Sequence, residues 1–244
     1  MRLATWNINS IRTRVSRAVD FAVREDIDVL AFQETKCKPE QFPYEPFEEA
    51  GYQVEVHGLN QWNGVAIASR LPMTDVRTSF AGQPGFAKGH EGPDAQLEAL
   101  RTATAAELAA DPNLPLALVG DFNIIPFDHD NGDPAIVQGF STHVSPPERE
   151  AFFALESAGV TDVVRPLIPE GYTYWDYQRL KFPRNEGIRI DFVLGSKPFA
   201  DAVTGASIHR DERKGEQPSD HVPVVVDLDF GGGDDDGDLP MIFS

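Results

Sequence analysis

The sequence predicts a layered α/β fold, in which strands and helices alternate along much of the chain. Residues 3–8 and 27–32 are apolar runs of strand length, and residues 13–25 between them carry apolar side chains at helical spacing. Residues 93–110 are rich in alanine and leucine, which is typical of a second long helix. From residue 160 onward, short strand-like runs dominate.

The N-terminal half is expected to contain four strands and the first helix. A strand, a helix and a strand over residues 3–32 indicate two neighbouring strands joined by a crossover helix. Residues 51–57 and 64–69 read as two more strands, because a turn of sequence Asn60-Gln61-Trp62-Asn63 separates them.

The second half is expected to begin with the helix at residues 93–110, which opens on a proline, a residue that the first turn of a helix tolerates. A strand at 116–119 and a helix at 147–158 follow. Further strands are predicted at 160–164, 173–177, 188–194, 206–209 and 222–230.

Polar side chains gather where several of these strands meet loops. The segments are Thr5-Trp6-Asn7-Ile8-Asn9, Gln33-Glu34-Thr35, Gly120-Asp121-Phe122-Asn123 and Ser219-Asp220-His221. A further acid, Asp191, lies within a strand-like run. In layered α/β folds this edge is where ligands bind. Carboxylates and amides without thiolates suit Mg²⁺ or Mn²⁺ rather than zinc, so the pattern predicts a metal-dependent phosphoester hydrolase.

Composition narrows the class of protein. The chain has 244 residues, 41% of them hydrophobic, which is enough for one large domain or two small ones. No apolar run approaches a membrane span, and the N-terminus has no signal-peptide pattern. A single cysteine, Cys37, excludes an internal disulfide framework, so we expect a cytoplasmic protein.

The net charge of −18 argues against simple nucleic-acid binding, which normally depends on Lys and Arg. Three basic groups, at residues 12–14, 179–184 and 210–214, soften this objection because the local field matters more than the sum. The alternatives are that these groups are ordinary solvated faces, and that the acidic balance reflects a salt-rich cytoplasm.

Taken in order, the motifs resemble the exodeoxyribonuclease III and AP endonuclease branch of the endonuclease/exonuclease/phosphatase superfamily. They are WNINS followed by IR, AFQETK, QFP, GY, NGVAIASR, LVGDFNI, TYWDY, GIRIDFVLGS and PSDHVPV, and they span residues 1 to about 230. The resemblance implies a four-layer α/β/β/α sandwich of two mainly antiparallel sheets flanked by helices. It also implies a DNA repair enzyme, expected to be monomeric, that cuts double-stranded DNA at abasic sites and 3′ ends.

The resemblance also assigns catalytic roles. Asn7 would orient the site, and Asp121 would activate the attacking water or assist the leaving oxygen. Asn123 and His221 would contact the scissile phosphate, with Asp191 holding the other ring nitrogen of His221. An unpaired carboxylate within an apolar run is costly, which independently favours a partner for Asp191. The alternative for Asp121 and Asn123 is a simple Asx turn.

The remaining roles concern the metal and the substrate. The residues implied as metal-binding are Glu34, Asp220 and Asn9, with Mg²⁺ or Mn²⁺ as the cofactor. The residues that resemble the family's pocket for an extruded abasic sugar are Tyr174, Trp175, Ile188 and Ile190. The alternative is that all four are core residues.

Between Arg70 and Leu114 the sequence departs from the family. The expected Tyr-x-Pro-Asn-Gly segment is absent, and with it a catalytic tyrosine, a phosphate-contacting asparagine and two central strands. Two other functions therefore stay open. One is a catalytically impaired relative that binds DNA or the sliding clamp, and the other is a hydrolase of small phosphoesters.

The C-terminus is predicted to be a tail separate from the domain at residues 1–230. Residues 231–238, GGGDDDGD, have the composition of a flexible linker. Leu239 to Phe243 are similar to the short peptides that bacterial repair proteins insert into the replication sliding clamp. Asp238 stands where those peptides usually begin with glutamine.

Overall fold

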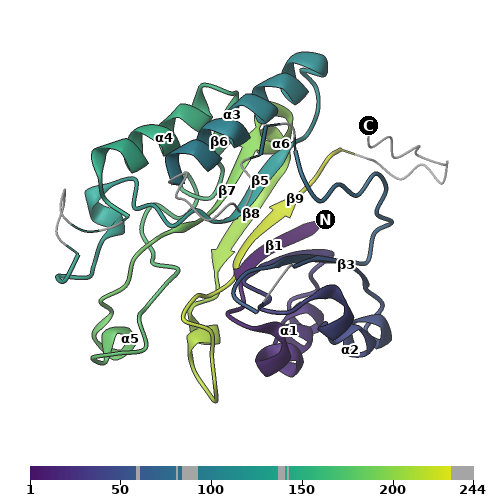
Figure 1. The fold of residues 1–244 in the computed structure, drawn as a ribbon, viewed down its shortest axis with the longest axis vertical. Helices are drawn as coiled ribbons and strands as arrows, with labels where there is room; N and C mark the ends of the chain where they lie inside the picture. The colour runs from purple at the N-terminus through teal and green to yellow at the C-terminus, as the bar shows by residue number, and fades with distance from the viewer. Residues whose placement is uncertain (59–60, 81, 84–92, 137–140, 142, 232–244) are drawn as a thin grey trace.

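Two β-sheets lie face to face in the computed structural model of the chain, and helices cover their outer faces (Figure 1). The structure describes residues 1–58, 61–80, 82–83, 93–136, 141 and 143–231. Residues 232–244, which include the predicted clamp-binding peptide, lie outside the described residues. Among the described helices, none is long and apolar enough to cross a membrane.

The larger sheet has six strands in the order β3-β4-β2-β1-β9-β8. Their bounds are β1 Arg2–Asn7, β2 Val29–Gln33, β3 Gln53–His57, β4 Val65–Ser69, β8 Val203–Ile208 and β9 Val224–Leu228. As the sequence predicts, β1 and β2 are parallel and joined by helix α1, Ile11–Arg24. The other neighbours in this sheet are antiparallel.

The smaller sheet has three antiparallel strands in the order β5-β7-β6. They are β5 Ala117–Asp121, β6 Val160–Asp162 and β7 Asp191–Ser196. Helices α3, Pro93–Ala110, and α4, Pro146–Glu156, cover its outer face (Figure 1). Helix α4 begins with a capping box, in which the Ser145 side chain and the Glu148 carboxylate satisfy each other's backbone N–H groups.

Short helices complete the described chain. They are α2 Tyr44–Glu49, α5 Lys181–Arg184 and α6 Lys197–Ala202, with 3₁₀ turns at Pro39–Gln41, Asp128–Asp130 and Arg210–Arg213. The sequence did not predict these elements, because three to six residues carry too little periodicity to be recognised.

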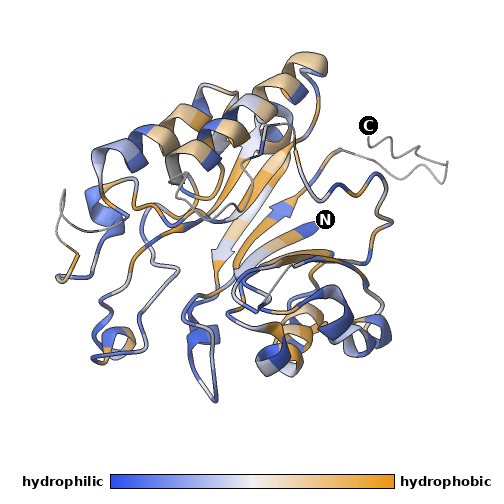
Figure 2. Ribbon diagram, in the orientation of Figure 1, coloured by the Kyte–Doolittle hydropathy of each residue, from blue (hydrophilic) through white to orange (hydrophobic). Residues whose placement is uncertain are grey.

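Apolar side chains fill the spaces between the layers, and Figure 2 shows the strands as the most apolar part of the ribbon. One cluster lies between the larger sheet and helices α1 and α2, and includes Trp6, Phe21 and Phe47. A second joins the two sheets, and includes Val193, Val224 and Val226. A third packs α3 and α4 on β5 and β7. The predicted four-layer arrangement is therefore confirmed.

One strand prediction was wrong, and another placed the start of its strand too early. Residues 173–177 form no strand, and Tyr174 makes only isolated bridges to Ile188 and His221. The reason is that this segment lies between two elements: the Tyr174 N–H donates to Ile188, whereas the Trp175 N–H donates to Asp220. Strand β7 begins at Asp191 rather than at residue 188, because Ile188 pairs with this segment instead of with β5.

The expected loss of two strands leaves part of the larger sheet uncovered. Strand β5 is an edge strand of the smaller sheet, and its main contacts with the larger sheet are with β1 and β2. The inner face of β4 is consequently open: Val65 is 50% exposed and Ile67 is 42% exposed. The described residues between β4 and α3 contain no strand.

This open face gives a stability prediction. Ile67→Ala is expected to lower the free energy of unfolding by about 1 kcal/mol or less, because the side chain is already partly in water. Ile27→Ala, at a fully buried position, is expected to cost about 3 kcal/mol. Urea denaturation of both variants measures the difference, and equal costs would mean that β4 is covered in solution.

Candidate active site

Strand ends from both sheets meet at one edge of the sandwich. Asn7 ends β1, and Glu34 follows the last residue of β2. Asp121 ends β5 and lies directly opposite Asp191, the first residue of β7. Two carboxylates opposite each other on neighbouring strands repel, so this register requires a compensating positive group.

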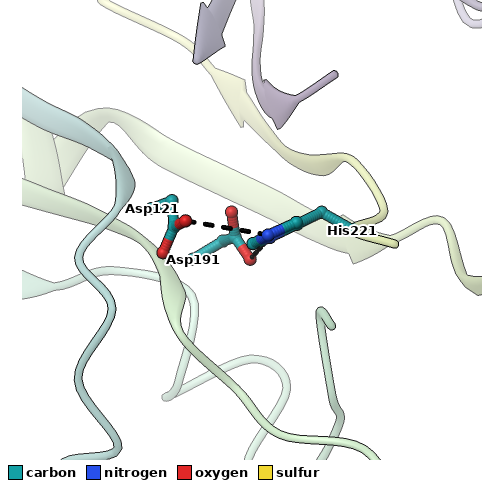
Figure 3. A group of neighbouring side chains, drawn as sticks. All are labelled: Asp121, Asp191 and His221. Carbon is teal, nitrogen blue, oxygen red and sulfur yellow. Dashed lines mark hydrogen bonds and ion pairs between the residues drawn. The ribbon is translucent and has the colours of Figure 1, made fainter. Parts of the chain in front are cut away.

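His221 supplies that group. Its ring faces both carboxylates (Figure 3), with Nδ1 2.9 Å from an Asp191 oxygen and Nε2 3.7 Å from an Asp121 oxygen. The His221 side chain is 5% exposed, that of Asp121 is 5% exposed and that of Asp191 is fully buried. The predicted pairing of Asp191 with His221 is therefore present in the structure.

Burial and mutual charge set the ionisation of this group. Burial is the largest influence on Asp121 and raises its pKa, the charge of His221 opposes this and the charge of Asp191 adds to it, so that the pKa is about 6. Burial lowers the pKa of His221, but the charges of Asp191 and Asp121 outweigh it and raise the pKa to about 10. At neutral pH the imidazole is thus positively charged, while Asp121 is able to exchange a proton.

Two asparagines hold the Asp121 carboxylate. The Asn7 side-chain amide donates to Asp121 Oδ2 at 3.1 Å, and the Asn123 side-chain amide donates to the same oxygen at 3.0 Å. The Asn123 backbone N–H also donates to Asp121 Oδ1 at 2.8 Å, which is the contact of an Asx turn. The turn and the site are therefore not alternatives, because the turn orients a carboxylate that faces His221.

A second group of side chains lies beside the first. The Lys36 ammonium pairs with Glu34 at 2.9 Å and also donates to the side-chain oxygen of Asn9. The Asn9 amide in turn donates to Asp220 at 2.8 Å. Burial favours the neutral form of Glu34, but hydrogen bonds from Lys36 and Asn7 and the nearby charges of Lys36 and His221 lower its pKa.

The donor atoms fit a hard divalent cation. Glu34, Asp220 and Asn9 offer the carboxylate and amide oxygens that such an ion prefers, and in the structure the Lys36 ammonium contacts two of them, Glu34 and Asn9. Among the described residues, one group of three acidic or histidine side chains has its ligand atoms close enough together to share an ion, and it consists of Asp121, Asp191 and His221. The structure thus gathers two neighbouring sets of ligand atoms at the same edge.

The loop after β2 is held in an unusual conformation. Glu34 and Lys36 have positive φ angles, +49° and +52°, which non-glycine residues adopt only when their surroundings impose them. The turn before β4 imposes it here: the Thr35 N–H donates to the Gly64 carbonyl and the Lys36 N–H donates to the Asn63 carbonyl. A Cβ atom at Gly64 would lie 2.3 Å from the Thr35 hydroxyl oxygen.

Gly64→Ala is therefore expected to lower the free energy of unfolding by about 3 kcal/mol, because it adds a clash to a φ of +119°. The matched control is Gly51→Ala, where φ is +86° but no atom lies within 4 Å of the new Cβ. That variant is expected to cost about 1 kcal/mol. Thermal denaturation of both variants measures the difference. Equal losses of stability would mean that the close contact with Thr35 adds no cost at Gly64.

The four residues predicted to line a sugar pocket lie in different surroundings. Trp175, Ile188 and Ile190 are 1–2% exposed and belong to the packed interior. Tyr174 is half-buried, and its ring meets the His221 ring edge-on with centroids 4.9 Å apart. Of the four, Tyr174 has both exposure and contact with the acidic group, so the pocket stays a prediction that rests mainly on this residue.

Sequence reasoning missed two residues that shape the site. Lys36 follows Glu34 by two positions, and a basic residue so near a predicted metal ligand could have indicated that the two side chains pair. Ser219 is buried, donates to the Asn7 carbonyl at 2.7 Å and accepts from the His221 N–H at 3.2 Å. It thereby ties the end of β1 to the loop before β9.

A four-layer sandwich with an oxygen-rich, histidine-containing centre at its strand ends is suited to hydrolysis of phosphoesters. A model of the Endonuclease/Exonuclease/phosphatase family matches residues 4–221. The chain therefore belongs to this family and, within it, to the exodeoxyribonuclease III and AP endonuclease group.

Curated relatives agree with this placement. Exodeoxyribonuclease III of Haemophilus influenzae is 29% identical over 266 residues, covering 93% of this chain and 100% of the relative. Exodeoxyribonuclease of Bacillus subtilis is 28% identical, covering 93% of this chain and 98% of the relative.

Solved structures give the same result. A 3′ phosphatase from Neisseria bound to a product DNA hairpin has a TM-score of 0.86 at 30% identity, covering 94% of this chain and 99% of the neighbour. An AP endonuclease from Archaeoglobus fulgidus has a TM-score of 0.82 at 28% identity, covering 94% and 99%.

Proposed function

We propose that the chain is a divalent-metal-dependent DNA repair nuclease that hydrolyses phosphodiesters at abasic sites and at 3′ ends. The observation that carries this proposal is the position of His221 between Asp121 and Asp191, at an edge where strands of both sheets end. Relatives named as exodeoxyribonuclease III and AP endonuclease, which align over nearly the whole chain, support the same function.

The residues of the site suit attack by water on a phosphodiester. The charged His221 imidazole holds an anionic phosphate oxygen, and Asp191 keeps the ring in one orientation by accepting from Nδ1. Asp121 accepts a proton from the attacking water, and Asn7 positions that carboxylate. Asn123 reaches the scissile phosphate once its amide leaves Asp121.

Glu34, Asp220 and Asn9 are the proposed metal ligands, with Mg²⁺ or Mn²⁺ as the ion. When bound, such an ion offsets the negative charge of the phosphodiester and of the attacking oxygen. Lys36 would have to give up its contacts with Glu34 and Asn9 to the ion, and its ammonium is then placed to face the substrate phosphate.

The chain lacks the family's Tyr-x-Pro-Asn-Gly segment, yet the described acidic centre does not draw on residues 70–114. This supports retained activity over the impaired relative. The remaining features stay proposals: a cytoplasmic monomer, with residues 239–243 binding the replication sliding clamp. Calorimetry of the clamp with the full chain and with a chain ending at residue 238 tests the last point.

Substrate class is tested by comparing three substrates in Mg²⁺: a duplex with one internal abasic-site analogue, an intact duplex with a free 3′ end, and bis-p-nitrophenyl phosphate. The proposal expects incision at the analogue and shortening from the 3′ end, with weak turnover of the small diester. Turnover of the small diester without cleavage of either duplex would instead favour the small-phosphoester hydrolase.

A further inference from the structure

Trp62 is the most exposed of the large apolar side chains that the structure describes. It is 71% exposed, whereas the other two tryptophans of the chain, Trp6 and Trp175, are 0% and 1% exposed. An indole is mostly apolar, and leaving it in water forgoes the stabilisation that burial would give. The proposed chemistry of the acidic centre makes no use of it.

The turn that carries Trp62 is fixed to the loop that carries Glu34. Asn63 and Gly64 accept backbone hydrogen bonds from Lys36 and Thr35, at 3.0 and 3.1 Å. A second glycine of the turn, Gly58, is packed so closely that a Cβ there would lie 2.3 Å from the Cys37 carbonyl oxygen. The position of Trp62 is therefore tied to the rim of the candidate active site.

The same rim carries two lysines, each near an acid: Lys36 pairs with Glu34 at 2.9 Å and Lys38 lies 4.0 Å from Glu40. Lys36 and Lys38 follow Glu34, and the Lys38 side chain is 54% exposed. The guanidinium of Arg12 also lies near this rim. Its positive charge opposes the rise that burial causes in the pKa of the Cys37 thiol. Proteins that bind an unpaired strand commonly combine cations, which meet its phosphates, with an exposed aromatic ring, which meets a base.

We propose that Trp62 is a stacking platform for a nucleobase of the DNA substrate, next to the phosphate held at His221. The inference rests on the proposed function, because it requires DNA as the substrate. The base that stacks must have a free face, which a paired base inside a duplex lacks. A terminal base at a 3′ end has such a face, and so does a base bordering an abasic gap.

Stacking on a flat ring recognises any base, so Trp62 should contribute binding without sequence preference. Trp62→Ala is expected to raise KM about tenfold both for DNA with a 3′ end and for DNA with an abasic site, with kcat changed less than about threefold. Trp62→Phe should recover most of the loss because a phenyl ring still stacks. Val23→Ala, which removes a smaller exposed apolar side chain on α1, is the control and should match the wild type.

A second experiment identifies the partner base. In a series of duplexes, each nucleotide flanking the cleaved bond is replaced in turn by a cyclohexyl nucleoside, whose saturated ring fills the place of the base without an aromatic face. At one position, this replacement should raise KM about tenfold for the wild type and have little further effect for Trp62→Ala, which is the non-additivity of two groups in contact.

Fluorescence provides a readout that does not depend on catalysis. Because Trp6 and Trp175 are buried, acrylamide should quench mainly Trp62 in the free protein. Adding duplex with a 3′ overhang, in EDTA to prevent cleavage, should protect this emission, and Trp62→Phe should lack the effect.

Three results would overturn the assignment: unchanged KM for Trp62→Ala, additive losses at every flanking position, or a Trp62 that stays open to acrylamide on saturated DNA. Each presupposes that the wild-type chain cleaves and binds DNA. A wild type inactive on every duplex would contradict the proposed function itself, so the two failures are distinguishable.

Discussion

Asp121→Asn is expected to lower kcat for DNA cleavage about 10³-fold, since a positioned general base contributes of that order. The amide is nearly isosteric with the carboxylate and keeps one oxygen for the hydrogen bonds from Asn7 and Asn123. It lacks the ability to accept a proton from water. The fold should be preserved, because burial already disfavours a charge at this position and the neutral amide removes that cost.

The raised pKa of Asp121 predicts that activity is lost at low pH. The pKa of Asp121 is raised to about 6, so the base form is lost as pH falls through that value. We expect log(kcat/KM) to fall with a slope of about one below pH 6 and to be level just above it. The free energy of unfolding depends on pH in the opposite direction. Because the pKa of Asp121 is higher in the folded protein than in the unfolded chain, its contribution to that free energy falls as pH rises from the unfolded-state pKa toward 6.

The control for this variant is Asp201→Asn, at an exposed position on α6. It should retain wild-type kcat and the same pH profile. If Asp121→Asn kept more than about a tenth of the wild-type kcat, with normal thermal stability, Asp121 would not be the base.

Glu34→Ala is expected to abolish the response of the protein to Mg²⁺ and to lower kcat/KM by about 10² to 10³-fold. A ligand that binds only the folded state stabilises it by about 2.7 kcal/mol at a hundredfold excess over its Kd, which for a chain of this length is roughly 5–10 °C in Tm. The wild type should show this shift on adding Mg²⁺, and Glu34→Ala should not.

Removing Glu34 also leaves the Lys36 ammonium with the Asn9 oxygen alone, so metal-free stability must be measured in the same series. Glu40→Ala is the control, because that carboxylate is 68% exposed on a neighbouring turn. A Mg²⁺-induced shift of equal size in Glu34→Ala would place the ion elsewhere, with the Asp121, Asp191 and His221 group as the remaining candidate.

Local pattern in the sequence predicted the main helices, most strands and the convergence of the site, whereas the four layers were implied by the resemblance to the family. Apolar periodicity marks the long helices and the buried strands, and polar residues at strand ends must meet when the strands share an edge. That Asp191 has a partner was also predictable, since a carboxylate next to Phe192 and Val193 is costly when unpaired, and the resemblance to the family pointed to His221.

What the sequence did not predict depends on contacts between distant segments. Residues 173–177 have strand-like composition, but their N–H groups are divided between Ile188 and Asp220, so no ladder forms. Lys36 acquires its role from Asn9, which comes from another strand end. The exposure of Trp62 is likewise set by the packing of glycines in its turn against the loop after β2.

The central claim is that the Asp121, Asp191 and His221 centre works as one hydrolytic unit in a chain without the Tyr-x-Pro-Asn-Gly segment. The most direct measurement is the single-turnover incision rate, with Mg²⁺, on a duplex carrying one abasic-site analogue. It is made for the wild type, Asp121→Asn, His221→Gln and the double variant. We predict incision by the wild type, a large loss in each single variant and little further loss in the double, since residues that act together are non-additive. Losses that simply multiply, or a wild type that leaves the duplex uncut, would contradict the account.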